Sequence, residues 1–200
     1  MSTNKRKPRI TARMRFAHHE AGHAVLSAAI NDTPHLVSIR QIGESFGRTR
    51  QQMIGRPEVL VQVHLAGYAA EHQLTGRRPP QLKADLGFAI LSLIEPAHTT
   101  LAAEMDLVGR DEYLAVRELL AMGCAPRIEI VRAEVDRFYE AARASLVAVW
   151  PAVQSVAAAL LKCEELDRNR FFEAIGGFEL YGPVLTAQEA HGLRANNKSC

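Results

Sequence analysis

The residues best suited to chemistry lie near the start of the chain, where His19, Glu20 and His23 form the pattern HExxH (HEAGH at 19–23). Histidines four positions apart lie one above the other on a helix, so both imidazoles can reach one zinc ion. The glutamate between them lies beside that ion, where it can take a proton from water and deliver it to a leaving amine. These residue types at this spacing predict a zinc-dependent hydrolytic site with Glu20 as catalytic base.

Five residues are a short pattern, and the alternative interpretation is a structural histidine pair with satisfied side chains. The surrounding sequence favours the metal site, because the pattern lies inside a predicted helix at 11–30 that has no interior proline. Small residues at Ala21, Gly22 and Ala24 allow another element to approach this helix closely.

A catalytic zinc site needs a third protein ligand and leaves its fourth position open. Spacing alone does not choose among the downstream side chains with a suitable donor atom, which are His35, His64, Glu71, His72, Asp85 and His98. Each of them has the alternative interpretation of a solvated side chain on a helix.

The elements that must position these residues are predicted to form a mainly α-helical (α+β) fold. A β-branched segment at 36–42 predicts a strand, and Gly43 and Gly47 predict a turn before a second short extended segment. The remaining predicted helices occupy 57–74, 82–94, 110–122, 126–149, 151–162 and a last segment that has Asp167 as N-cap and ends at Gly176-Gly177.

Composition indicates a globular protein that can bury a sizeable core, since 48% of the 200 residues are hydrophobic. The net charge of +2 makes no strong prediction about the charge of a partner. Basic residues do gather in residues 1–15, without any acid. Such a run is typical of a solvated, flexible N-terminal arm, and we prefer this interpretation to nucleic-acid binding.

Cellular location is predicted from cysteines and from the absence of targeting patterns. Cys124, Cys163 and Cys200 are far apart and odd in number, which favours a reducing compartment over a disulfide scaffold or a thiolate zinc cluster. No apolar run is long enough to span a bilayer, and no secretory signal or P-loop pattern occurs. We therefore expect a soluble, cytoplasmic protein.

Four ordered segments together resemble the peptidase domain of the FtsH family, the ATP-dependent zinc metalloproteases. They are HEAGHAVL at 19–26, VSIRQIGESFGRT at 37–49, LAGYAAEH at 65–72 and KADLGFAI at 83–90. They correspond to the family's HEAGH helix, the strand and turn after it, its LAGRAAEE-like helix and its GAxxDL segment. The similarity continues through helical segments at 130–144 and 156–175, so it covers about residues 10–176.

The resemblance implies a role for each matching residue. His19 and His23 correspond to the histidine ligands, Glu20 to the catalytic glutamate and Asp85 to the third, aspartate ligand. Glu71 corresponds to a glutamate that would steady a ligand histidine. The predicted strand corresponds to an edge that pairs with an extended substrate backbone, and its residues are Val37, Ser38, Ile39 and Arg40.

The chain also departs from the family pattern. These 200 residues contain no counterpart of the family's ATPase module or membrane anchors. His72 replaces the second glutamate of the AAEE element, and Pro79-Pro80-Gln81-Leu82 stands where a Thr-Gly-rich approach to the aspartate is usual. These departures concern substrate delivery and the rim of the site, and they leave the metal and base positions intact.

The expected organisation is a basic arm at 1–10, a metallopeptidase domain at 11–176 and a loosely ordered tail at 177–200. Within the domain, 11–106 would carry the metal site and 107–176 would form a C-terminal helical bundle. The expected function is zinc-dependent hydrolysis of peptide bonds in flexible or unfolded substrates, alone or with a separate ATPase. The family works as rings, which leaves homo-oligomerisation open. The alternative is a non-catalytic, zinc-containing binding or regulatory module related to these peptidases.

Overall fold

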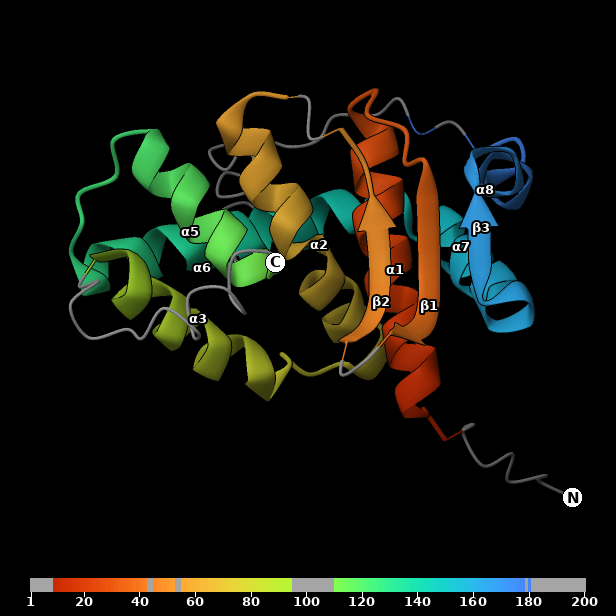
Figure 1. The fold of residues 1–200 in the computed structure, drawn as a ribbon, viewed down its shortest axis with the longest axis horizontal. Coiled ribbons are helices and arrows are strands. Elements are labelled where there is room, and N and C mark those ends of the chain that lie inside the picture. The colour runs from red at the N-terminus through yellow and green to blue at the C-terminus, as the bar shows by residue number, and fades with distance from the viewer. Residues whose placement is uncertain (1–8, 43–44, 53–54, 95–109, 179, 181–200) are drawn as a thin grey trace, which may run out of the picture.

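The computed structural model describes residues 9–42, 45–52, 55–94, 110–178 and 180. In these ranges the chain forms a mainly helical α+β fold with seven helices and one three-stranded antiparallel sheet (Figure 1). The helices are α1 (Ala12–Ala29), α2 (Pro57–Thr75), α3 (Pro80–Ile94), α5 (Asp111–Ala121), α6 (Ile128–Ala148), α7 (Trp150–Cys163) and α8 (Arg168–Ile175). The strands are β1 (Leu36–Ile42), β2 (Ser45–Arg50) and β3 (Glu165–Asp167). The predicted mainly α-helical (α+β) class is confirmed.

Helix α1 lies at the centre of the fold and carries the HEAGH segment. Its N-cap is Thr11, whose hydroxyl accepts a hydrogen bond from the amide of Met14 at 3.2 Å. Helix α2 crosses α1 at very close range, because a Cβ on Gly22 would lie only 2.6 Å from the carbonyl oxygen of Ala66 and 2.8 Å from the Cβ of Ala70. The close approach predicted from small residues is therefore confirmed, and it brings α2 against the histidine-bearing part of α1.

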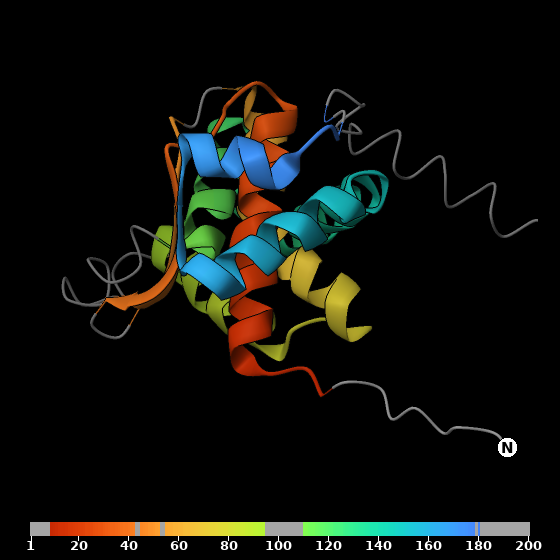
Figure 2. The same ribbon diagram turned by 90° about the vertical axis from the view of Figure 1, so that its right-hand side faces the viewer.

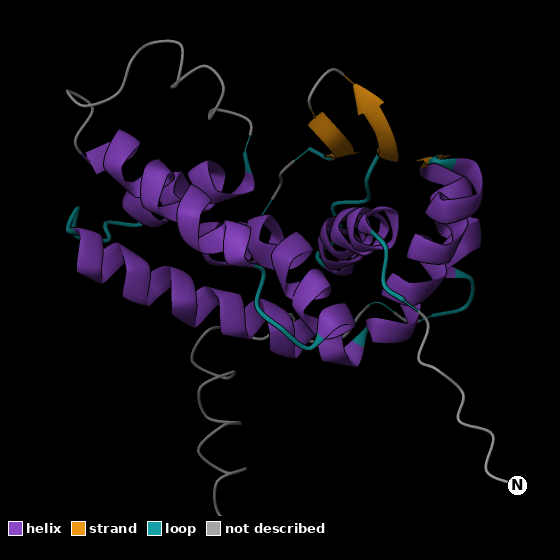
Figure 3. Cartoon of the chain, turned by 90° about the horizontal axis from the view of Figure 1, so that it is seen from below, coloured by secondary structure: helices purple, strands orange, loops and turns teal. Residues whose placement is uncertain are grey.

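The sheet lies on one side of the helical layer, in the strand order β2-β1-β3 (Figures 1 and 3). Strand β1 pairs antiparallel with β2, with Ser38 opposite Arg48 and Leu36 opposite Arg50, and a register shift interrupts the pairing between Ser38 and Gln41. Strand β2 lies on the side of α2 and α5, whereas β3 lies beside α7 and α8 (Figures 1 and 2). The strand nearest the site is therefore β2.

The prediction that Val37, Ser38, Ile39 and Arg40 form a sheet edge is wrong over most of its length. Strand β3 pairs with Leu36–Ser38, and the carbonyl of Glu164 accepts a hydrogen bond from the amide of Ile39 at 2.8 Å. Strand β3 has only three residues, too few for a recognisable hydrophobic alternation, so the sequence did not predict it. Its Leu166 lies opposite Val37 and is buried. Among the described residues, β2 has no strand on its outer edge.

The C-terminal helices complete the core. Helix α6 packs on α2, and α7 packs on α1. One hydrophobic cluster runs from Ala17 to Leu180, so the predicted halves at 11–106 and 107–176 share a single core. Asp167 caps α8 as predicted, with its carboxylate accepting from the amide of Arg170 at 2.9 Å. The predicted arm at 1–10 and tail at 177–200 lie almost entirely outside the described residues.

No single helix in the described part of the chain is long and apolar enough to cross a bilayer. Helices α6 and α7 reach the length and apolar composition of a span only when taken together, and they are bent by 84° where they join.

Candidate metal centre

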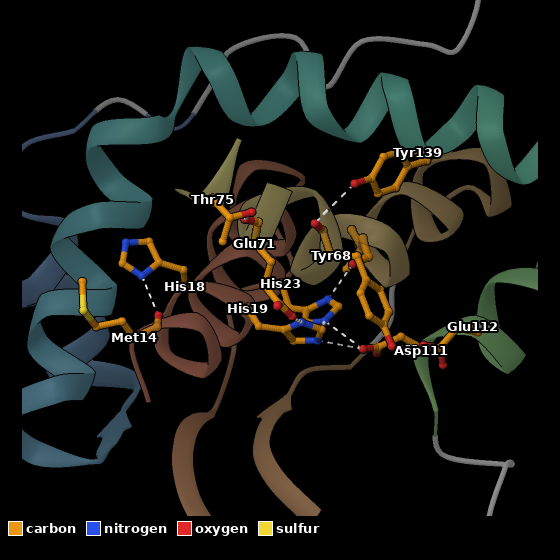
Figure 4. Close-up of polar contacts among 11 residues, drawn as sticks. Met14, His18, His19, His23, Tyr68, Glu71, Thr75, Asp111, Glu112 and Tyr139 are labelled. Carbon is orange, nitrogen blue, oxygen red and sulfur yellow. Dashed lines mark hydrogen bonds and ion pairs between the residues drawn. The ribbon is translucent and has the colours of Figure 1, made fainter. Parts of the chain in front are cut away.

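Three electron-pair donors from two helices converge on one point (Figure 4). The Nε2 atoms of His19 and His23, both on α1, lie 3.1 Å apart. Asp111, the first residue of α5, places its Oδ2 atom 3.1 Å from the Nε2 of His19 and 3.0 Å from that of His23. These side chains form a group that could hold a metal ion, with donor atoms all within 4.8 Å of one another.

The opposite nitrogen of each imidazole shows which way the rings are protonated. His19 Nδ1 lies 2.8 Å from the carboxylate Oε1 of Glu71, and His23 Nδ1 lies 2.7 Å from the backbone carbonyl oxygen of Val63. Both partners are acceptors, so each Nδ1 carries the proton and donates. A neutral imidazole then has a lone pair on Nε2. Two such lone pairs and a carboxylate oxygen face one another, and only a proton or a cation between them makes this arrangement favourable.

The electrostatics of the group also favour a cation. Burial by itself would lower the pKa of His19, but its bonds to Asp111 and Glu71 raise this pKa well above 6.5. The pKa of His23 is raised as well, because Asp111 outweighs the effect of burial. Burial would raise the pKa of Asp111, yet the two imidazoles hold it far below its ordinary value. An ionised carboxylate therefore faces two rings whose Nε2 atoms attract positive charge.

A glycine on α2 makes room for the two rings. A Cβ built on Gly67 would overlap the Nε2 atoms of both His19 and His23. Any side chain at this position would displace the donor atoms from each other. The residues present thus fit a metal ion in two ways, through the chemistry of the donor set and through the space left around it.

Glu20 lies next to this group and is held by β2. Its side chain is 6% exposed, and the hydroxyl of Thr49 donates a hydrogen bond to its Oε2 atom at 2.8 Å. Gly47 lies against the same carboxylate with φ +91°, and a Cβ there would overlap Oε1. Burial raises the pKa of Glu20, and the nearby histidines partly offset this effect. A carboxylate with a raised pKa is suited to accept and return protons near neutral pH.

The third donor differs from the one implied by the resemblance. Asp85 lies on α3 and lines the same cavity as His19 and His23, but the converging group contains Asp111 instead. The assignment of Asp85 as ligand stays a prediction. Asp111 was not among the sequence candidates, since it lies 88 positions beyond His23 and nothing local marks it except its place in the first turn of a predicted helix.

The other candidates lie outside the converging group, although His64 lines the same cavity. Glu71 contacts His19, as the resemblance implied for a supporting residue. His72 lies 3.0 Å from the hydroxyl of Tyr139, and His35 is exposed. His64 is 3% exposed, its Nε2 atom has no hydrogen-bond partner among the described residues, and burial lowers its pKa to about 4. His98 lies outside the described ranges.

The group opens into a cavity of about 700 Å³. Strand β2 borders this cavity over 47–50, and Tyr68 and Glu112 lie on its helical side. The hydroxyl of Tyr68 donates to Glu112, and the Tyr68 ring meets His19 edge-on at 5.0 Å between centroids. This volume lies within the range of small-molecule binding pockets.

Comparison with known proteins adds no family to these observations. No protein-family model matches the chain, and no curated protein is significantly similar to it. The likeness of its motifs to the FtsH peptidase domain therefore remains an expectation from sequence alone.

Proposed function

We propose that this chain is a zinc-dependent metalloendopeptidase-like hydrolase with His19, His23 and Asp111 as ligands and Glu20 as general base. The observation that supports this most is the convergence of three electron-pair donors beside a buried carboxylate. Two imidazoles and one carboxylate are a donor set typical of catalytic zinc sites, which keep a fourth position open. The three donor atoms lie only 3.0 Å and 3.1 Å apart, so His19, His23 and Asp111 would all reach one ion placed between them.

The chain's own residues divide the work of hydrolysis. When bound, a zinc ion supplies Lewis-acid activation of water and of the substrate carbonyl. Glu71 and the carbonyl of Val63 orient the two ligand imidazoles through their Nδ1 atoms. Glu20, held by Thr49, takes the proton from the attacking water and returns it to the leaving amine.

The substrate backbone is proposed to lie along the outer edge of β2. This edge borders the cavity, whereas β1 is paired on both sides over Leu36–Ser38. An extended peptide added to a sheet edge is held mainly by main-chain hydrogen bonds, so peptides of many sequences can bind. This requirement for an extended backbone favours flexible or unfolded substrates.

The test is a comparison of Glu20→Gln with the wild-type chain after zinc loading. We expect both proteins to bind zinc in a 1:1 ratio and the variant to hydrolyse a flexible peptide about 10²- to 10⁴-fold more slowly, the usual contribution of a general acid–base residue. Glu173→Gln, an exposed glutamate on α8, is the matched control and should keep wild-type activity. Equal rates for Glu20→Gln and the wild type would falsify the role of Glu20.

A second outcome would favour the non-catalytic alternative. Full zinc occupancy without hydrolysis of unfolded protein or of a peptide library, together with co-purification of an ATPase, would indicate a binding or regulatory module. The metal would then act as a structural staple between α1 and α5.

A further inference from the structure

Three arginines of the sheet border the cavity without an acidic partner among the described residues. Arg40, Arg48 and Arg50 are exposed and line the cavity that contains the metal-binding group. Among the described residues, no ion pair joins any of them to an acid. Other exposed arginines do pair, as Arg78 does with Asp136 at 2.5 Å. The sheet side of the cavity therefore presents positive charge that the rest of the described chain does not neutralise.

The alternation of side chains along β2 places two of these arginines on the face opposite the one that contacts Glu20. Gly47 and Thr49 face Glu20, as the hydroxyl contact and the close approach of Gly47 require. Side chains of a strand alternate between its two faces, so Arg48 and Arg50 lie on the opposite face, with about 6.7 Å between neighbours on one face. A peptide added along β2 alternates in the same way. Every second side chain of that peptide would lie beside Arg48 or Arg50.

We propose that the outer edge of β2 selects acidic peptides, with Asp or Glu at alternate positions beside Arg48 and Arg50. The inference rests on the proposed function, because it assumes a peptide lying along β2. Guanidinium groups bind carboxylates through paired, charge-assisted hydrogen bonds. Arg40, on the neighbouring strand and lining the same cavity, adds to the positive charge there.

The preference is confined to one face of the peptide. Side chains on the other face point toward the carboxylates that line the cavity, which are Glu20, Asp85, Asp111 and Glu112. Acids there would meet like charge. An alternating pattern should therefore bind better than the same number of acids placed consecutively, since consecutive acids occupy both faces.

The experiment measures peptide binding without turnover. Fluorescent peptides of equal length, with Asp, Asn or Lys alternating with Ala, are titrated into zinc-loaded Glu20→Gln protein and followed by anisotropy. We expect the Asp peptide to bind about 2- to 30-fold more tightly than the Asn peptide, as two exposed ion pairs allow. It should also bind more tightly than a peptide with the same Asp residues in one block. The advantage should shrink in about 1 M salt, where charges are screened within about 3 Å.

Charge reversal identifies the residues responsible. In the Glu20→Gln background, R48E/R50E should reverse the order of affinities and favour the Lys peptide. R77E/R170E makes the same change in net charge at exposed arginines that do not line the cavity, and it should keep the preference for Asp. Equal affinity for the Asp and Asn peptides would overturn the inference, as would an equal response to the two double variants. A mixed-sequence oligonucleotide that loses affinity with R48E/R50E while the Asp peptide does not would also overturn it.

Failure of this inference and failure of the proposed function give different results. If the wild type cleaves the Asn peptide and Glu20→Gln does not, the proposed function stands even when acidic residues give no advantage. If acidic peptides bind through Arg48 and Arg50 but the zinc-loaded wild type cleaves none of them, the acidic-peptide surface stands and the hydrolytic function fails.

Discussion

Two carboxylates compete for the third ligand position, and their removal has different expected effects. The contacts of Asp111 with both Nε2 atoms predict that Asp111→Asn weakens zinc affinity by more than about 100-fold, which is the upper end for losing a residue that only supports a ligand. Asp85→Asn should weaken it by less than about 10-fold, because Asp85 only lines the cavity. Competition with a chromophoric chelator measures both constants. The reverse order would assign the ligand to Asp85, as the family resemblance implies.

His64 makes a prediction about pH and stability. Its pKa is lowered to about 4 by burial, below the value of 6.5 for the unfolded chain. The unfolded chain therefore binds more protons between these two values, and the free energy of unfolding should fall as pH drops from about 6.5 to 4. The shift corresponds to about 3 kcal/mol. His64→Leu should remove this pH dependence. It should also raise stability at pH 7, because it removes a buried Nε2 atom that has no hydrogen-bond partner among the described residues.

Urea unfolding of the wild type and of His64→Leu at pH 4.5 and pH 7 measures the effect of His64. The contributions of other titrating groups cancel in the difference between the two proteins. His35→Leu replaces an exposed histidine and serves as the control, with the pH dependence of the wild type expected. If His64→Leu loses as much stability on acidification as the wild type does, burial of a neutral His64 is not the cause.

At the scale of elements, the contact between α1 and α2 decides whether the site can form. Glycine-to-alanine changes at two positions inside helices separate the effect of this contact from that of helix propensity. Helix propensity favours alanine over glycine by up to about 1 kcal/mol. Gly87→Ala on α3 should stabilise the fold, because its Cβ would meet only the guanidinium of Arg132 at 3.7 Å. Gly67→Ala should instead destabilise it and abolish zinc binding, since the Cβ would overlap His19 and His23.

Thermal unfolding and zinc titration of the two alanine variants measure this contrast between α2 and α3. Helix propensity alone predicts that both alanine variants are more stable than the wild type. A Gly67→Ala protein that keeps zinc affinity and gains stability would show that the rings do not lie against α2 in the way described.

At the scale of the whole molecule, zinc should hold α5 against α1. A ligand that binds only the folded state at 100 times its dissociation constant adds about 2.7 kcal/mol to stability. For a chain of this size that corresponds to a rise in Tm of about 5–10 °C. Chelation should reverse the rise and speed amide hydrogen exchange in α5, whose first residue is Asp111. Asp111→Asn should show neither response to zinc. Unchanged exchange in α5 upon chelation would contradict a bridging role for the metal.

Local features of the fold could be predicted from sequence, whereas features that depend on distant pairs could not. Strand β1 at 36–42, the start of α2 at Pro57 and the cap Asp167 follow from hydrophobic pattern and capping chemistry within a few residues. Strand β3 exists only because β1 is beside it, and three residues carry no pattern. The pairing that makes β1 the central strand therefore cannot be predicted from the sequence of β1 or of β3 alone.

In the candidate site, too, residues set by local spacing could be predicted, whereas residues brought in by packing could not. His19, Glu20 and His23 are set by the spacing of one helix, so the sequence alone could predict them. Asp111 joins them only through the packing of α5 against α2 and α3, and no periodicity links it to the histidines. Thr49, which holds Glu20, likewise depends on how β2 lies on α1. Residues that bond across elements need the three-dimensional arrangement before their role can be inferred.

His23 and Asp111 are 88 positions apart, so a metal held by both would be a cross-link across almost half of the chain. A covalent bridge that closes a loop of about 100 residues removes unfolded-state entropy worth about 4.7 kcal/mol. The histidine pair, in contrast, is local and exists as soon as α1 forms. A growing chain would therefore capture metal weakly through α1 during synthesis and lock it only after α5 has emerged. Assembly of the proposed site would then follow the order of translation, and the carboxylate of Asp111 would be the last ligand to join.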